Sequence, residues 1–145
     1  TENTLASIQK ALDLGVDMIE IDVFKIQSGE IVVFHDERVD RLANSGGRIE
    51  EYNIVQLRQL ILDGGHKIPM LQDVLKLINN QVALNIELKG KGTATPTIEI
   101  LQIELFECIL LNLMSEDLNS FKDFLSSSTG TVKVKLANLP SSVIF

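Results

Sequence analysis

The stretch that decides the fold is Glu20–Asp36, which reads EIDVFKIQSGEIVVFHD. Two runs rich in Val, Ile and Phe flank Ser28-Gly29, a residue pair typical of a tight turn. This pattern predicts one strand over 18–26 and a second over 30–34, joined as a β-hairpin. The stretch also sets two acids near one end and a His-Asp pair at the other, and that polar set needs an explanation.

The turn decides which hairpin residues share a face. A two-residue turn sets Asp22 opposite His35, and Glu20 then lies diagonal to the imidazole on the same face, about 7–8 Å away. Phe34 and Val23 would pair on the opposite face. The two acids and the histidine are therefore either the solvated rim of a half-buried hairpin or a group of cation-binding and proton-transfer residues. A longer or bulged turn would shift the pairing by one residue and separate the three groups.

Helical and strand patterns alternate along the rest of the chain. Helices are predicted over 3–14, 53–62, 69–79 and 117–125, strands over 82–88 and 131–137, and either a buried helix or a strand followed by a helix over 98–113. Gly64-Gly65 is expected to end the second of these helices. Strands separated by helices predict βαβ units, and hence a parallel sheet that is open or rolled into a barrel. Residues 1–145 are expected to form a single partial domain.

Composition limits the classes of protein to which the chain can belong. It has 145 residues, of which 45% are hydrophobic and 23% charged, as in one soluble globular unit. The formal charge of −7 argues against a nucleic-acid partner. No apolar run reaches the roughly 18 residues that a transmembrane helix needs. The sequence shows no signal segment and a single cysteine, which favours the cytoplasm without determining the compartment.

A second polar pattern lies in the predicted strand at 82–88. Asn85, Glu87 and Lys89 alternate onto one face at the carboxyl end of this strand, where barrel active sites gather. Carboxylates from two strands could together hold a hard cation such as Mg²⁺ or Ca²⁺. This predicted cation site consists of Glu20, Asp22 and Glu87. His35 would then be free for acid–base chemistry, and Lys89 for a phosphate oxygen.

Six short segments, in their order and spacing, resemble the motifs of one enzyme family. They are Glu2-Asn3-Thr4 (P-E-N-T), Glu20–Val23 (E-x-D-V), Val33–Asp36 (V-x-H-D), Asp40–Ile49 (D-R-T-T-x-G-x-G), Ile68–Leu71 (I-P-T-L) and Asn85–Lys89 (N-I-E-x-K). The agreement runs from Glu2 to about Lys89 and more faintly to about Val134. The chain therefore resembles the glycerophosphodiester phosphodiesterases, enzymes of lipid and glycerol metabolism.

The resemblance implies an α/β fold, a TIM (β/α)8 barrel that is incomplete in this chain. It implies a divalent metal on Glu20, Asp22 and Glu87, phosphate contact by Lys89, and His35 as one of two acid–base histidines. Apart from the resemblance, Glu2, Asp36 and Asn85 are candidates to orient His35 or a metal ligand, and Glu2 and Asp36 are equally good candidates for caps. The implied reaction is hydrolysis of small glycerophosphodiesters to glycerol 3-phosphate and an alcohol, through a cyclic phosphate formed by attack of a neighbouring glycerol hydroxyl.

The match departs from the family at its first barrel strand. The family's His-Arg pair, which would precede Thr1, is absent, and His66, in a predicted loop, is not expected to replace its histidine. An eight-stranded barrel usually needs about 200–250 residues. An open barrel exposes unpaired edges, so self-association is expected if the chain exists alone. Three alternatives stay open: a related phosphodiesterase acting on intact lipid headgroups, a catalytically incomplete metal-binding, phosphate-binding or assembly module, and a structural fragment.

Overall fold

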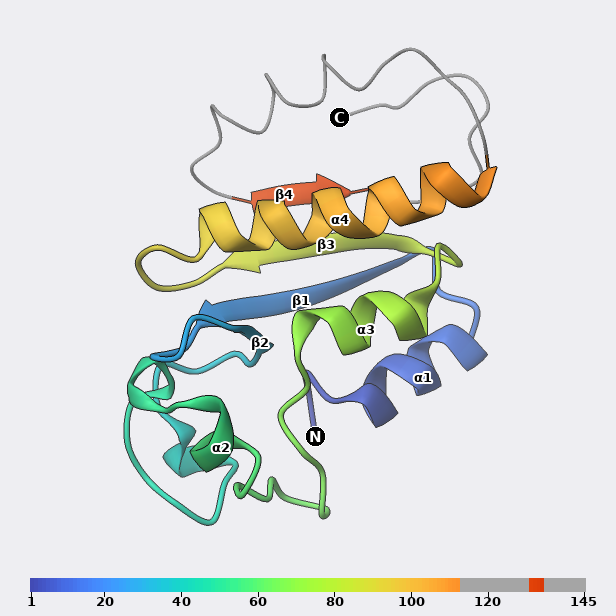
Figure 1. Cartoon of the computed structure of the whole chain (residues 1–145). Coiled ribbons are helices and arrows are strands. Elements are labelled where there is room, and N and C mark those ends of the chain that lie inside the picture. Colours follow the sequence, from blue (N-terminus) through green and yellow to red (C-terminus); the bar gives the residue numbers. More distant parts are fainter. Residues whose placement is uncertain (113–130, 135–145) are drawn as a thin grey trace.

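The computed structural model describes residues 1–112 and 131–134, with side chains as far as Glu104. Its sheet has the strand order β2-β1-β3-β4 (Figure 1). The strands are β1 (Met18–Lys25), β2 (Ile31–Val33), β3 (Ala83–Leu88) and β4 (Thr131–Val134). β1 and β3 are parallel, as predicted for a βαβ unit, whereas β2 runs antiparallel to β1 and β4 antiparallel to β3. The β3–β4 pair thus departs from the parallel order predicted for a barrel. The predicted helix at 117–125 lies outside the described residues.

The hairpin exists, but its predicted register is wrong by one residue. Val23 faces Val33 and Lys25 faces Ile31, and the Phe34 N–H donates to the carbonyl of Asp22 at 2.9 Å. Asp22 is therefore not opposite His35, and Phe34 is not the partner of Val23. His35 instead lies in a bend after the end of β2.

A three-residue turn causes this shift. The Ile26 N–H donates to the Glu30 carbonyl at 3.0 Å, and the Gly29 N–H donates to the Ile26 carbonyl at 3.0 Å. Gln27 therefore belongs to the turn rather than to the strand. Gly29 has a φ of +103°, a conformation that is costly for residues with a Cβ.

Three helices lie on one face of the sheet (Figure 1). They are α1 (Leu5–Asp13), α3 (Leu71–Ile78) and α4 (Ala94–Asn112). Thr4 caps α1 by accepting a hydrogen bond from the Ser7 N–H, and the four buried residues of α3 point toward the sheet. Their apolar side chains and those of β1 and β3 form one cluster, the sheet core. It includes Ile8, Ile19, Ile21, Val23, Leu71, Val74, Leu84, Ile86 and Leu101.

Residues 98–113 were predicted as either a buried helix or a strand followed by a helix, and the structure shows a helix as far as Asn112. α4 begins at Ala94 and continues to Asn112. Thr93, directly before it, is buried, and its carbonyl accepts a hydrogen bond from the Thr97 N–H. Within the described part of the chain, no helix is long and apolar enough to cross a membrane.

Residues 37–68 form an irregular arm over the other face of the hairpin (Figure 1). The arm contains η1 (Val39–Arg41), η2 (Ile49–Glu51) and α2 (Ile54–Leu57). It packs against the hairpin in a second cluster, the loop core. This cluster comprises Phe24, Ile26, Val32, Phe34, Val39, Ile49, Leu57, Leu60, Leu62 and Ile68.

The helix predicted over 53–62 is wrong beyond its first turn. Asn53 caps α2 as expected, but the helix ends at Leu57. The Lys67 ammonium then bonds the carbonyls of Arg58 and Leu60 at 2.9 and 3.0 Å, and Leu62 pairs with the backbone of His66. Gly64-Gly65 therefore turns the chain between paired segments and does not end a helix. These tertiary contacts outweigh the local helical pattern.

Candidate active site

The acidic groups of β1 and β3 meet on one face because the two strands are paired in parallel register. Glu20 lies beside Asn85, and Asp22 lies beside Glu87. One carboxylate oxygen from each of Glu20, Asp22 and Glu87 lies within 4.8 Å of the others. The predicted convergence of these three acids is therefore observed, and such an oxygen cluster could hold a cation.

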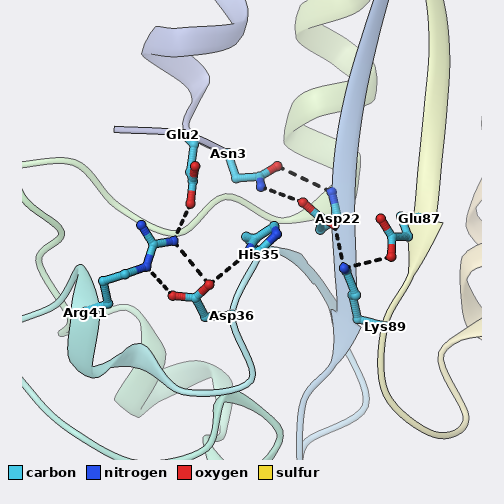
Figure 2. Close-up of polar contacts among 8 residues, drawn as sticks. All are labelled: Glu2, Asn3, Asp22, His35, Asp36, Arg41, Glu87 and Lys89. Carbon is cyan, nitrogen blue, oxygen red and sulfur yellow. Dashed lines mark hydrogen bonds and ion pairs between the residues drawn. The ribbon is translucent and has the colours of Figure 1, made fainter.

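Two neighbours orient the buried Asp22 carboxylate (Figure 2). The Lys89 ammonium lies 3.2 Å from Asp22 Oδ1 and 2.7 Å from Glu87 Oε1, so it bridges the two strands. The Asn3 amide donates to Asp22 Oδ2 at 3.0 Å, and its carbonyl accepts from the Asp22 N–H at 3.4 Å. Both oxygens of Asp22 are thus satisfied, which a buried carboxylate requires.

The backbone at the strand ends is fixed by Thr93. Its hydroxyl donates to the Lys89 carbonyl at 2.5 Å and accepts from the Lys25 N–H at 3.3 Å. The Lys89 N–H in turn donates to the Val23 carbonyl at 2.9 Å. The ends of β1 and β3 are therefore tied together where the acidic side chains project.

Asn85, the expected supporting residue, has one unused acceptor. It is on the same face as the acids, and its Oδ1 is buried without a hydrogen-bond partner among the described residues. A buried acceptor without a partner is costly unless something outside the protein satisfies it. Asn85 could therefore bind a ligand of the site, or a water molecule on that ligand.

The site histidine lies beside this cluster rather than within it (Figure 2). His35 Nδ1 is 2.7 Å from Asp36 Oδ1. Asp36 also accepts from Arg41, with Nε on Oδ2 at 2.5 Å and Nη2 on Oδ1 at 3.1 Å. Arg41 Nη2 makes a further ion pair with Glu2. Asp36 thus contacts His35 directly, as a supporting residue would, whereas Glu2 bonds Arg41 rather than His35.

Charges in the site shift its pKa values in consistent directions. Partial burial and the neighbouring acids Asp22 and Glu87 raise the pKa of Glu20. The ion pair between Lys89 and Glu87 lowers the pKa of Glu87 and raises that of Lys89. The hydrogen bond to Asp36 raises the pKa of His35. Burial is the larger cause of the raised pKa of Glu20, and repulsion from the two neighbouring acids adds to it.

His66 lies away from this site. Its backbone pairs with Leu62, and its side chain borders a small cleft lined by Thr4, Ile68 and Asp73. The sequence contains only two histidines, so His35 is the single histidine of the candidate site. His66 therefore lies outside the candidate site.

Sequence reasoning missed the contacts of Asn3 and Arg41. Both residues lie in quoted motifs, Asn3 in Glu2-Asn3-Thr4 and Arg41 at the start of the Asp40–Ile49 segment. Their contacts span 19 and 39 positions in the chain, to Asp22 and Glu2 respectively. No periodicity links residues so far apart, and only their place in the motifs could have marked them.

Residues 1–125 match the glycerophosphoryl diester phosphodiesterase family. The chain belongs to this family. A glycerophosphodiester phosphodiesterase of Caldanaerobacter subterraneus is 37% identical over 106 residues, which cover 68% of this chain and 44% of that protein. The human glycerophosphodiester phosphodiesterase 1 is 30% identical over 114 residues, covering 71% of this chain and 34% of that protein.

Solved structures of family members have a similar fold. A phosphodiesterase of Oleispira antarctica, in complex with the product sn-glycerol-3-phosphate, gives a TM-score of 0.66 at 32% identity. That match covers 70% of this chain and 46% of the solved chain. The enzyme of Thermotoga maritima gives a TM-score of 0.62 at 33% identity, over 68% and 42% of the two chains. The fold is thus of the TIM-barrel phosphodiesterase type, and the chain spans less than half the length of these relatives.

Proposed function

We propose that these residues form part of the active site of a glycerophosphodiester phosphodiesterase, which hydrolyses its substrate to glycerol 3-phosphate and an alcohol. The observation that carries the proposal is the convergence of three carboxylates and a lysine on one face of two paired parallel strands, with the site histidine beside them just after β2. The product bound to the Oleispira antarctica relative supports a substrate of this class.

The donor set fits a hard divalent cation, Mg²⁺ or Ca²⁺. Glu20, Asp22 and Glu87 supply oxygen ligands within one small space, and their combined charge exceeds that of Lys89. The unused acceptor of Asn85 lies on the same face. The chemistry supplied by a bound divalent cation is neutralisation of the phosphate oxygens and a lower pKa for the attacking hydroxyl.

The side chains of this chain have distinct roles in the proposed reaction. Lys89 presents a charged ammonium that can bind a phosphate oxygen while it stays beside the acids. His35 carries out proton transfer, because an imidazole both takes and gives a proton near neutral pH. The hydrogen bond to Asp36 raises its pKa and so favours the protonated form. Asp36 holds the His35 ring through Nδ1, which leaves Nε2 for the reacting hydroxyl or the leaving alkoxide.

A second candidate function is a metal-binding, phosphate-binding or assembly module that is catalytically incomplete. One observation favours it: the site contains one histidine, whereas the proposed reaction uses an acid and a base. We propose that the chain self-associates through the edges of its open sheet, which light scattering across a concentration series tests.

The decisive experiment measures release of glycerol 3-phosphate from glycerophosphocholine and glycerophosphoethanolamine. The reactions contain Mg²⁺, Ca²⁺ or a chelator, and compare the chain with its His35→Ala and His66→Ala variants. We expect cation-dependent turnover that His35→Ala abolishes and His66→Ala preserves. Turnover that persists in the chelator, or in His35→Ala, would contradict the proposed roles.

A chain that binds cations but does not turn over substrate would favour the second candidate. Calorimetry with Mg²⁺ and Ca²⁺ on the chain and its Glu20→Gln variant separates these outcomes. Binding that Glu20→Gln weakens, without turnover, identifies an intact cation site in an incomplete enzyme. Absence of both cation binding and turnover would contradict the phosphodiesterase and the metal-binding form of the second candidate.

A further inference from the structure

A series of three charged side chains connects the start of the sequence to the site histidine (Figure 2). The contacts run from Glu2 to Arg41, then to Asp36 and finally to His35. Arg41 binds both oxygens of Asp36 with two different nitrogens, the paired geometry in which a guanidinium fixes the plane of a carboxylate. Asp36 therefore cannot rotate without breaking two charge-assisted hydrogen bonds.

The carboxylates of Glu2 and Asp36 do not form a second metal site with His35, although one ligand atom of each of the three residues lies within 4.8 Å of the others. The Arg41 guanidinium bonds both Glu2 and Asp36 and so already supplies their cation. An arginine keeps its charge at any pH that a protein experiences, and the two carboxylates raise its pKa further. The cluster is consequently a fixed ion-pair network with an imidazole at one end.

The ionisation of Asp36 determines which imidazole nitrogen carries the proton. The hydrogen bonds from Arg41 and His35 lower the pKa of Asp36 to about 2, so the group is a carboxylate at neutral pH. An ionised carboxylate can only accept hydrogen bonds. The short contact to Asp36 therefore requires a proton on Nδ1 of His35, which leaves the lone pair of the neutral ring on Nε2.

We propose that Arg41, anchored by Glu2, is a positioning residue: it holds Asp36 so that His35 is kept in the Nδ1–H tautomer with Nε2 free for proton transfer. Arg41 touches neither His35 nor the acids of the cation site in any contact of the described residues, and it acts through Asp36 alone. This inference rests on the proposed function only for the role of Nε2, because the tautomer itself exists whether or not the chain turns over substrate.

The same network explains why an irregular arm can position a reacting group. His35 follows the end of β2, and Arg41 ends η1, so neither is held by sheet hydrogen bonds on both sides. Without Arg41, the Asp36 carboxylate could rotate toward solvent. The imidazole would then lose the acceptor that selects its tautomer. A group in the wrong tautomer cannot take the attacking proton even if its ring is correctly placed.

The test is nitrogen NMR of the imidazoles in the ¹⁵N-labelled chain, at a pH well above the pKa of His35. Because the sequence contains only two histidines, the His66→Gln variant assigns both sets of signals. We expect the unmodified chain to give the Nδ1–H pattern for His35. Arg41→Gln should lose this preference and give a mixture of tautomers.

Arg38→Gln is the matched control, because Arg38 lies in the same exposed arm and its guanidinium bonds only Asp40 among the described residues. It should keep the Nδ1–H pattern. A folded Arg41→Gln variant with the unmodified tautomer ratio would overturn the proposal. If Arg41→Gln does not fold, Glu2→Gln and Arg41→Lys decide: each should shift the ratio partway, and an unchanged ratio in both overturns the proposal equally.

Turnover gives a second, separate readout. Where the chain hydrolyses glycerophosphodiesters, Arg41→Gln should lower kcat by about 10-fold to 100-fold, the range typical of residues that orient a functional histidine. KM should change little, since Arg41 contacts neither Lys89 nor the acids of the cation site among the described residues. Arg38→Gln should leave both values unchanged. A rise in KM at constant kcat would assign Arg41 to substrate binding and overturn the positioning role.

Discussion

The candidate site has a sheet half and a loop half that are built by different means. The sheet half consists of Glu20, Asp22, Glu87 and Lys89, on one face of two paired parallel strands. The loop half consists of Glu2, His35, Asp36 and Arg41, which belong to bends, a short 3₁₀ helix and the chain before α1. Backbone hydrogen bonds position the first half, whereas side-chain ion pairs position the second, so the two halves should respond differently to substitution.

The largest expected difference between the halves is in stability. Ile86 is fully buried in the sheet core, and Leu62 is 2% exposed in the loop core. Each change to Ala should cost about 2–5 kcal/mol of local packing. Ile86→Ala should lower the free energy of global unfolding, whereas Leu62→Ala should mainly open residues 37–68. Hydrogen exchange checks this, and equal acceleration in β3 by both variants would show that the two cores unfold as one unit.

The acids could be predicted from the sequence more fully than the histidine network. The alternation of Glu20 and Asp22 in one strand, and of Glu87 and Lys89 in another, sets their faces without any knowledge of the turn. The predicted position of His35 depended on the hairpin register, and the three-residue turn that contains Gly29 shifts that register by one residue. A turn of two or three residues is compatible with the same sequence pattern, so this part of the site could not be fixed in advance.

The next largest effect is expected at the ligands of the sheet half. Asp22→Asn keeps the shape of the side chain but removes its charge. Loss of a supporting residue weakens metal binding by up to about 100-fold, and loss of this ligand should weaken Mg²⁺ or Ca²⁺ binding further. Calorimetry with each cation measures the loss. Asp13→Asn, an exposed change in α1, should leave the affinity unaltered. Unchanged affinity in Asp22→Asn would remove Asp22 from the cation site.

A smaller loss is expected from Asn3, which bridges the two halves by holding Asp22 from the chain before α1. Asn3 has a φ of +53°, so glycine keeps the backbone while it removes the amide. Asn3→Gly should weaken cation binding about 10-fold to 100-fold, because Asp22 loses the partner of its Oδ2. Asn79→Gly, at a φ of +42° after α3, is the control with a similar backbone. Equal affinities in both variants would mean that Asn3 supports only the backbone.

The smallest expected effect lies in the loop half and depends on pH. The pKa of Asp36 falls from 3.8 to about 2 on folding, because Arg41 and His35 bond the ionised form. A lowered folded pKa gives stability that is present above the unfolded pKa and is lost as the pH falls through the folded one.

Asp36→Asn should therefore be less stable than the unmodified chain at neutral pH, on the order of 1 kcal/mol after solvent screening. This gap should close as the pH falls from about 4 toward 2 in urea unfolding measured by circular dichroism. A gap that stays constant over that interval would show that Asp36 stabilises the arm by shape and not by its charge, and the ion-pair account of the loop half would fail.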